Sequence, residues 1–361
     1  AAKIDWYLKK FREEYEETET YIAKTKCPRF GSGEAKCVLN ETVRGNDVYI
    51  ICDVFNHGVT YEMYGVKNRM SPDEDLKRII AAISGKARRI TVVMPMLYEG
   101  RQHRRTARES LDCALALQEL VTMGVTNIIT FDAHDARVQN AIPISGFDDV
   151  QTTYQMIKAL TRVAPDISYD KESTIVISPD EGGMHRCMYY SSVLGLDLGM
   201  YYKRRNYSIV VNGKNPIEAH EYLGSSVAGK DVMIVDDMIS SGESVLDIAR
   251  KLKSQGARRI FIFTAFGLFC NGLESFDAAY KKGEITKVFT TNLVYRVPEL
   301  KEREWYCEVD MSKYIALLID TINHDETISQ LLVPVTRIKK LMEKHKQELK
   351  EQVSMFEGEK H

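Results

Sequence analysis

Two adjacent aspartates follow a run of apolar residues in the second half of the chain. Residues 231–244 read DVMIVDDMISSGES, which places Asp236 and Asp237 at the end of the run and a hydroxyl-rich loop after them. Such a continuous apolar run is typical of a parallel strand that is buried on both faces. The next apolar residues repeat at helical spacing and predict a helix after the loop: Val245, Ile248, Ala249 and Leu252.

A strand, a tight loop and a helix start have the chemistry of a sugar-phosphate site. Carboxylates at a strand tip accept hydrogen bonds from a diol, and the first N–H groups of a helix bind an anion at the positive end of the helix dipole. The loop residues that would hold the phosphate are Ser240, Ser241, Gly242, Glu243 and Ser244. The same residues also fit a plain helix start, with Ser240 or Ser241 as the N-terminal cap.

Charged side chains follow other predicted strands as well. Residues 101–108 contain four arginines and His103, and arginine offers a planar fork to phosphate oxygens and a flat face to a base. His134 lies close to acidic residues just after a strand, which suits a metal or phosphate ligand. Three cations, Lys203–Arg205, follow a strand further along. Each of these segments is also compatible with a solvated surface or a structural histidine.

Strands and helices alternate along the chain, which predicts the α/β class. The same plan occurs twice, so two domains are expected. Residues 54–70 are predicted to form a loop, and the stretch 206–229 suits a lid. The expected regions are an N-terminal helical extension at 1–28, domains at 29–165 and 166–335, and a charged helical tail at 336–361.

The composition is that of a globular protein and argues against several functions. The chain has 361 residues, of which 44% are hydrophobic and 28% charged, and a net charge of −2. This charge argues against general nucleic-acid binding and gives no attraction to a membrane. Neither a membrane span nor a secretory signal is recognisable, and the seven scattered cysteines predict free thiols in a cytoplasmic protein.

Several segments, in the same order, resemble motifs of the ribose-phosphate pyrophosphokinases (PRPP synthetases). The sugar-phosphate loop resembles the family's phosphoribosyl-binding loop, with Glu243 in place of a small residue. Ser32 and His103 stand where the family has aspartate. The other matching segments are RFGSGE at 29–34, RQHR at 101–104, DAH at 132–134, SPDEGG at 178–183 and KRR at 203–205.

The resemblance covers about residues 29–335 and implies an α/β fold of two tandem type I phosphoribosyltransferase-like domains, each a mainly parallel sheet flanked by helices. It implies a homo-oligomer, either a dimer or a hexamer. It assigns ATP binding to Phe30, Glu34, Arg101, Gln102 and His103, and Mg²⁺ binding to His134 and Asp180, with Asp132 in a supporting position. It assigns catalysis to Lys203 and Arg205, and ribose-phosphate binding to Asp236, Asp237 and the loop Ser240–Ser244.

The reaction that the resemblance implies is transfer of the diphosphoryl group of Mg-ATP to the C1 hydroxyl of ribose 5-phosphate, which releases AMP. Three alternatives stay open. Because a carboxylate repels a phosphate dianion, Glu243 would suit a larger 5-phosphoribosyl derivative such as a phosphodiester. The chain would otherwise be a non-catalytic regulatory homologue, or a phosphoribosyltransferase that acts on a base.

Overall fold

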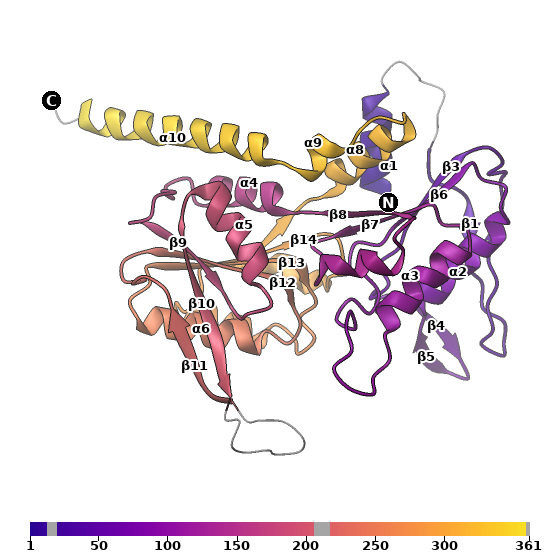
Figure 1. The fold of residues 1–361 in the computed structure, drawn as a ribbon, viewed down its shortest axis with the longest axis horizontal. Helices are drawn as coiled ribbons and strands as arrows, with labels where there is room; N and C mark the ends of the chain where they lie inside the picture. Colours follow the sequence, from indigo (N-terminus) through magenta and orange to yellow (C-terminus); the bar gives the residue numbers. More distant parts are fainter. Residues whose placement is uncertain (13–19, 206–216, 359–361) are drawn as a thin grey trace. The chain divides into compact units, whose positions relative to one another are not determined.

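The chain folds into two compact units, each built from more than one segment (Figure 1). The computed structural model describes residues 1–12, 20–205 and 217–358, and it describes no side chains for 203–205, 217–220 and 352–358. Unit 1 comprises Ala1–Thr152, Asn292–Tyr295 and Asp310–Leu332. Unit 2 comprises Thr153–Thr291, Arg296–Val309 and the segment from Val333 onward. Residues 310–332, expected in the second domain, thus pack in unit 1.

A parallel sheet of four strands forms the centre of unit 1, in the order β3-β6-β7-β8. Its strands are β3 (Asp47–Ile51), β6 (Arg89–Val93), β7 (Asn127–Phe131) and β8 (Gly146–Val150). The connecting helices are α2 (Pro72–Ile83), α3 (Asp112–Thr122) and the 3₁₀ helix η1 (Ala136–Ala141). One core cluster joins α2 and α3 to the sheet, through Leu76, Ile80, Ile83, Cys113, Leu117, Leu120, Ile50, Ile90, Val92 and Ile128.

The N-terminal region is only partly the helix that was predicted for 1–28. Helix α1 (Ala2–Phe11) packs beside α8 (Ser312–Asn323), and the chain then becomes extended in β1 (Thr25–Lys26), which pairs with β2 (Val38–Leu39). The predicted loop at 54–70 was also wrong, because it contains a hairpin of β4 (Thr60–Met63) and β5 (Val66–Arg69). Tyr64 and Gly65 both have positive φ, 55° and 71°, as a two-residue type I′ turn requires.

Unit 2 contains a sheet of seven strands in the order β11-β10-β9-β12-β13-β14-β15, all parallel except β11. Its strands are β9 (Thr174–Ser178), β10 (Asp197–Arg205), β11 (Ile217–Leu223), β12 (Asp231–Ile239), β13 (Arg259–Gly267), β14 (Lys287–Thr291) and β15 (Tyr306–Val309). From β9 the chain passes to β10, which is the neighbour of β9 on one side, and it later returns to β12, which is the neighbour of β9 on the other side. Strand order therefore reverses between β9 and β12, where ligands bind in open α/β sheets.

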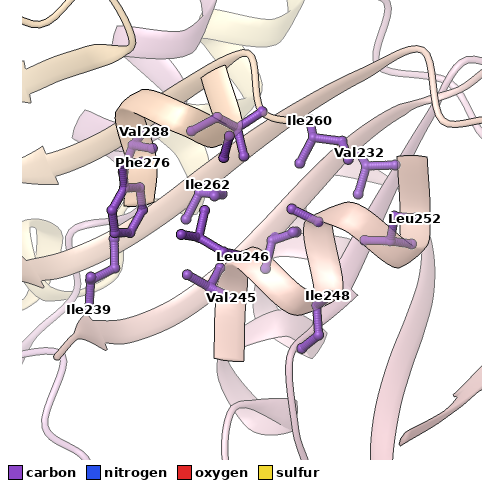
Figure 2. Packing of buried hydrophobic residues seen from close by; sticks show 14 of the residues in the cluster. Val232, Ile239, Val245, Leu246, Ile248, Leu252, Ile260, Ile262, Phe276 and Val288 are labelled. Atoms are coloured by element: carbon purple, nitrogen blue, oxygen red, sulfur yellow. The ribbon is translucent and has the colours of Figure 1, made fainter. Parts of the chain in front are cut away.

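Helices cover this sheet and bury β12 on both faces, as the sequence predicted. The helices of unit 2 are α4 (Thr153–Val163), α5 (Met184–Leu194), α6 (Glu243–Ser254), α7 (Glu274–Lys281), the 3₁₀ helix η2 (Pro298–Glu302) and α10 (Val335–Gly358). Figure 2 shows Val245, Leu246, Ile248 and Leu252 of α6 in one buried cluster with residues of three strands. Those strand residues are Val232, Ile260, Ile262 and Val288.

The same ion-pair arrangement occurs in both sheets, at the first residue of one strand in each. In unit 2, Asp231 opens β12, is fully buried, and accepts hydrogen bonds from the guanidinium groups of Arg258 and Arg259. In unit 1, Asp47 opens β3 and accepts from Arg88 and Arg89 in the same way. The sequence ARRI precedes or opens the neighbouring strand in each case, at 87–90 and 257–260. The repeat supports two copies of one domain plan.

The C-terminal region adds further helices to both units. α8 is followed by the short α9 (Ser329–Leu332) in unit 1, and α10 then packs against α4 and α5 in unit 2. His345 of α10 is buried and its Nε2 lies 2.8 Å from the carbonyl oxygen of Ile167. Across the residues that the structure describes, no helix is both long and apolar enough to cross a membrane.

Candidate functional site

Two carboxylates lie near the end of β12 in unit 2. The strand continues to Ile239, so Asp236 and Asp237 belong to it rather than follow it as predicted. Asp237 is buried, and its backbone N–H donates to Oδ1 of Asp236 over 2.9 Å. Burial raises the pKa of Asp236 to about 8, and the negative charge of Asp237 adds to this effect. The pair can therefore offer both an acceptor and a proton to the hydroxyls of a sugar.

The loop from Ser240 to Gly242 turns from β12 into α6. Gly242 occupies the N-cap position before the helix with φ of 87°, so neither Ser240 nor Ser241, the alternative caps, stands at that position. A Cβ atom on Gly242 would lie 2.3 Å from the ring of Phe276, which is fully buried. Only glycine fits here, because both the φ angle and the space exclude a side chain.

The first backbone N–H groups of α6 are the anion-binding feature of this loop. The helical pattern begins when Leu246 N–H donates to the Gly242 carbonyl, so the preceding N–H groups have no acceptor within the helix. One of them, from Glu243, reaches the hydroxyl of Ser241 over 3.4 Å. Ser244 is exposed beside them. Exposed N–H groups at the positive end of a helix dipole favour a phosphate.

Glu243, the unusual residue of this loop, is exposed, and its carboxylate has a neighbour outside the loop. Oε1 of Glu243 accepts from the side-chain amide of Asn271 over 3.5 Å. Asn271 follows β13, and the same segment is tied to the loop because Cys270 N–H donates to the Ser240 carbonyl over 2.9 Å. The carboxylate is therefore drawn toward Asn271, and solvent screens its charge.

Asp180 lies after β9, the strand next to β12, so Asp180 and the carboxylate pair flank the reversal in strand order. Its Oδ1 accepts from Gly183 N–H over 3.1 Å, just before α5, so the carboxylate also organises the helix start. A Cβ atom on Gly183 would lie 3.7 Å from the carbonyl oxygen of Val235. The start of α5 thus packs against the residue that precedes Asp236, which brings the Asp180 loop to the carboxylate pair.

Arg186 is a neighbour of this pair that the sequence analysis missed. It lies in the first turn of α5, and its charge lowers the pKa of Asp236 against the stronger effect of burial. A cation three residues after Gly183 was the available signal. Lys203 and Arg205 are part of strand β10, and the structure describes their backbone but not their side chains.

In unit 1, the structure brings together His103 and His134 from two of the predicted segments. Their ring centroids are 5.3 Å apart, and Nε2 of His103 lies 3.5 Å from the carboxylate of Asp135. Nδ1 of His103 is buried and has no hydrogen-bond partner among the described residues. Hydrogen bonds from Arg137 lower the pKa of Asp135 to about 2, so it stays ionised beside the histidine.

The other basic and acidic residues of this region divide into exposed and structural groups. Arg101 is exposed and Gln102 partly buried, in a turn that the Gln102 N–H closes on the Glu99 carbonyl over 2.7 Å. Asp132 is buried with a positive φ of 41°, and its carboxylate accepts hydrogen bonds from the hydroxyl and N–H of Thr152. It therefore anchors the turn that presents His134, which is exposed.

Phe30 and Glu34 lie at the tip of the hairpin that follows β1. Residues 30–34 are here called the tip loop. Phe30 N–H donates to the Glu34 carbonyl over 2.7 Å, and the Ser32 hydroxyl donates to the Glu34 carboxylate over 2.7 Å. The Phe30 ring is half exposed, with the Lys36 ammonium 5.4 Å from its centroid. An exposed ring beside a cation offers a face on which a base can stack.

No group of three or more His, Cys, Asp or Glu side chains that could hold a metal occurs in the described parts of the chain. Mg²⁺ is usually bound by one or two carboxylates together with substrate phosphates. Asp180 keeps one carboxylate oxygen beyond its bond to Gly183, and His134 presents an exposed ring. Taken singly, each of these residues fits a magnesium ion that is held mainly by substrate phosphates, and neither belongs to a metal cage made of protein alone.

Comparisons with known proteins agree with these features. A family model for the N-terminal domain of ribose phosphate pyrophosphokinase matches residues 9–124, and one for the phosphoribosyl transferase domain matches residues 147–293. Ribose-phosphate pyrophosphokinase of Mycoplasma pneumoniae is 30% identical over 273 residues, which span 73% of this chain and 74% of that protein. The enzyme of the same name from Pasteurella multocida is 28% identical over 314 residues, 84% of this chain and 89% of that one.

A solved structure shows the same fold. Phosphoribosylpyrophosphate synthetase from Mycobacterium smegmatis superposes with a TM-score of 0.72 and 18% identity, over 90% of this chain and 96% of that one. The expectation of two phosphoribosyltransferase-like domains with parallel sheets is confirmed. The site residues named above stay predictions, because no comparison tests them one by one.

Proposed function

The chain belongs to the ribose-phosphate pyrophosphokinase family, a family of enzymes, and from this premise we propose that it makes phosphoribosyl diphosphate. The diphosphoryl group of Mg-ATP passes to the C1 hydroxyl of ribose 5-phosphate, and AMP leaves. The relatives named for this activity match most of the chain and most of their own length.

The observation that carries the proposal is the connection from β12 to α6. Asp236 and Asp237 lie near the end of β12, beside the reversal in strand order. The short loop after this strand leads to the first N–H groups of α6, which have no acceptor within the helix. Ribose 5-phosphate has hydroxyls at one end and a phosphate at the other. We infer that Asp236 and Asp237 bind the hydroxyls and that Ser240–Ser244 bind the 5-phosphate.

The nucleotide is assigned to residues of unit 1. Phe30 supplies an exposed ring for the base, Glu34 an exposed carboxylate, and Arg101 a cation for phosphate oxygens. Gln102 and His103 follow Arg101 in the same turn. In this assignment the phosphate meets a cation and the base meets an aromatic ring, and both are groups that suit them.

His134 in unit 1 and Asp180 in unit 2 are each proposed as a Mg²⁺-binding residue that contributes one group, while substrate phosphates fill the other positions. When bound, Mg²⁺ neutralises phosphate charge and orients the phosphates for in-line displacement. Lys203 and Arg205 are proposed to stabilise the charge that develops toward the leaving AMP. Because phosphoryl-type transfer needs positioning and charge neutralisation, no nucleophilic side chain is required.

Ribose 5-phosphate is the acceptor that the loop geometry supports. Repulsion between the Glu243 carboxylate and a phosphate dianion would favour a larger derivative. The carboxylate is exposed and accepts from Asn271 at 3.5 Å, so the repulsion is weakened. We also propose a cytoplasmic homo-oligomer, a dimer or a hexamer, on the strength of the family resemblance.

Phosphorus NMR of the protein with Mg-ATP and ribose 5-phosphate tests the reaction. We expect AMP and an anomeric diphosphate to appear in equal amounts. If ATP binds and ribose 5-phosphate yields no product, the acceptor assignment is wrong. If ATP does not bind, the enzyme assignment itself is wrong and a regulatory role takes its place.

A further inference from the structure

Two cysteines face each other at the base of the tip loop. The ladder between β1 and β2 pairs Lys26 with Val38, so the next residues in the same register are Cys27 and Cys37. Both side chains are partly buried and both are free thiols. Each thiol affects the pKa of the other, as expected of side chains that face each other across an antiparallel pair.

The backbone geometry at this pair suits a disulfide. The bridge between Arg29 and Ala35 continues the register beyond the cysteines, and Lys36 N–H donates to the Pro28 carbonyl over 3.3 Å. Because hydrogen-bonded and non-hydrogen-bonded pairs alternate in an antiparallel ladder, the two cysteines form a non-hydrogen-bonded pair. In such a pair the Cα atoms lie about 4.5 Å apart, within the roughly 4.4–6.8 Å that a disulfide allows.

The surroundings set the rate of oxidation but do not prevent it. Burial raises the pKa of Cys37 to about 11, and charge on Cys27 would add to this. Burial also raises the pKa of Cys27, with a further contribution from the Asp75 carboxylate, which Arg29 contacts at 2.7 Å. Protonated thiols attack slowly, so oxidation needs an excess of oxidant. The equilibrium depends instead on how well the two sulfurs are placed for each other.

We propose that Cys27 and Cys37 form a redox-sensitive dithiol site that closes the base of the tip loop on oxidation and weakens ATP binding. One thiol loses its proton and attacks a small-molecule disulfide such as oxidised glutathione, and the second thiol then displaces the attached half. The S–S bond of the oxidant breaks and the one between the cysteines forms. Two reduced glutathione molecules leave and carry the two protons, so electrons and atoms balance.

The effect on ATP rests on the proposed function, in which Phe30 and Glu34 contact the nucleotide. A disulfide draws the two Cβ atoms to about 3.8 Å, from about 5 Å in an open cross-strand pair. This change twists the hairpin three residues from Phe30. Because small displacements of positioning groups weaken ligand contacts strongly, we expect KM for ATP to rise about tenfold.

The site itself is tested without measuring activity. The full chain is incubated with excess oxidised glutathione, the remaining thiols are alkylated, and the products are mapped by mass spectrometry. We expect a peptide joined through Cys27 and Cys37, while the exposed Cys270 carries glutathione. In Cys37→Ser, Cys27 should carry glutathione too. If both cysteines of the native chain are alkylated, or each carries its own glutathione, the proposal is overturned.

The functional link is tested on the same samples. Oxidation should raise KM for ATP, reduction with dithiothreitol should restore it, and Cys37→Ser should not respond in this way. A mapped disulfide with unchanged KM for ATP would overturn the link to the nucleotide. A reduced enzyme that forms no phosphoribosyl diphosphate would instead refute the proposed function, and the disulfide map would stand independently.

Discussion

The backbone N–H of Asp237 donates to the carboxylate of Asp236 over 2.9 Å, so the two neighbouring acids of β12 are not equivalent. Burial raises the pKa of Asp236 to about 8, and the charge of Asp237 adds to the shift. The raised pKa favours the protonated form of one carboxyl group of the pair. The proposed sugar site thus contains a hydroxyl-binding group whose charge changes near physiological pH.

The first prediction concerns the pH dependence of this pair. We expect KM for ribose 5-phosphate to fall as pH rises through about 8, because ionised Asp236 becomes a stronger acceptor. In the protein without ligand, the rise in pH acts in the opposite direction, because it lowers the free energy of unfolding. Stability from protonated Asp236 is complete below its ordinary pKa and is lost as pH rises toward about 8.

Asp236→Asn should remove both pH effects, which are measured by steady-state kinetics and by urea denaturation. Asp237→Asn is the comparison variant: its backbone N–H still reaches Asp236 but its charge is gone, so both pH effects should remain and move to lower pH. A native enzyme with flat KM across this pH interval would show that Asp236 does not bind the sugar as an anion.

The second prediction concerns Glu243. Because its carboxylate is exposed and accepts from Asn271, we expect Glu243→Gln and Glu243→Gly to change KM for ribose 5-phosphate by less than about threefold. Kinetics with ribose 5-phosphate and with a 5-phosphodiester of ribose measure the preference directly. Asn271→Ala serves as control, because it frees the carboxylate without removing it. A switch of acceptor preference in either Glu243 variant would restore the larger derivative as substrate.

The third prediction separates the two tasks of Asp180. Asp180→Asn keeps an oxygen for Gly183 N–H but loses the charge, so stability should be unchanged while the Mg²⁺ concentration for half-maximal activity rises at least about tenfold. Asp180→Ala loses the hydrogen bond as well and should also cost about 1 kcal/mol of stability. Magnesium titrations give the Mg²⁺ concentration for half-maximal activity, and denaturation curves give the free energy of unfolding. Equal Mg²⁺ dependence in native enzyme and Asp180→Asn would remove Asp180 from the metal site.

Local patterns accounted for much of the fold and for the outline of the site. The run before Asp236 predicted β12 because burial on both faces leaves a continuous apolar stretch. The hairpin at Thr60–Arg69 was missed because its short strands contain no buried residue and show little alternation. Residues 310–332 pack in unit 1 through long-range contacts such as Lys3 with Asp310, which no local pattern encodes.

Within the site, residue type alone did not separate binding from structural roles. Asp132 carries the same carboxylate as Asp180, yet it is buried and bonded to Thr152. Arg186 was missed because only the fold of α5 brings its charge near Asp236. Cys27 and Cys37 face each other because of the register between β1 and β2, and strands of only two residues leave no pattern in the sequence from which this register could be predicted.

The fourth prediction tests the glycine before α6. Gly242→Ala places a Cβ atom 2.3 Å from the Phe276 ring at φ of 87°, so it should cost about 2–4 kcal/mol from strain and overpacking together. Gly256→Ala is the matched control at φ of 91°, where the nearest atom is at 3.4 Å, and it should cost about 1 kcal/mol. Urea denaturation compares the two. Equal costs would show that Phe276 does not limit the loop.

The last prediction concerns the buried ion pairs at the start of β12. Asp231 is fully buried between Arg258 and Arg259, and although burial alone would raise its pKa, hydrogen bonds from Arg259 and Arg258 hold the pKa below its ordinary value. We expect Asp231→Ala to cost about 2–3 kcal/mol. This is less than the roughly 3–5 kcal/mol of a pair buried on both sides, because the arginines reach solvent.

The matched control is Asp166→Ala, since Asp166 contacts the same Arg259 at 2.9 Å but is exposed, and its loss should cost less than about 1 kcal/mol. Because the pKa of Asp231 is lowered, its contribution is present above its ordinary pKa and is lost as pH falls through the folded value. Asp231→Asn should therefore show a smaller loss of stability on acidification than the native chain. If urea denaturation shows that Asp231→Ala and Asp166→Ala lower the free energy of unfolding equally, the buried ion pair contributes no more to the stability of the unit 2 sheet than a surface contact.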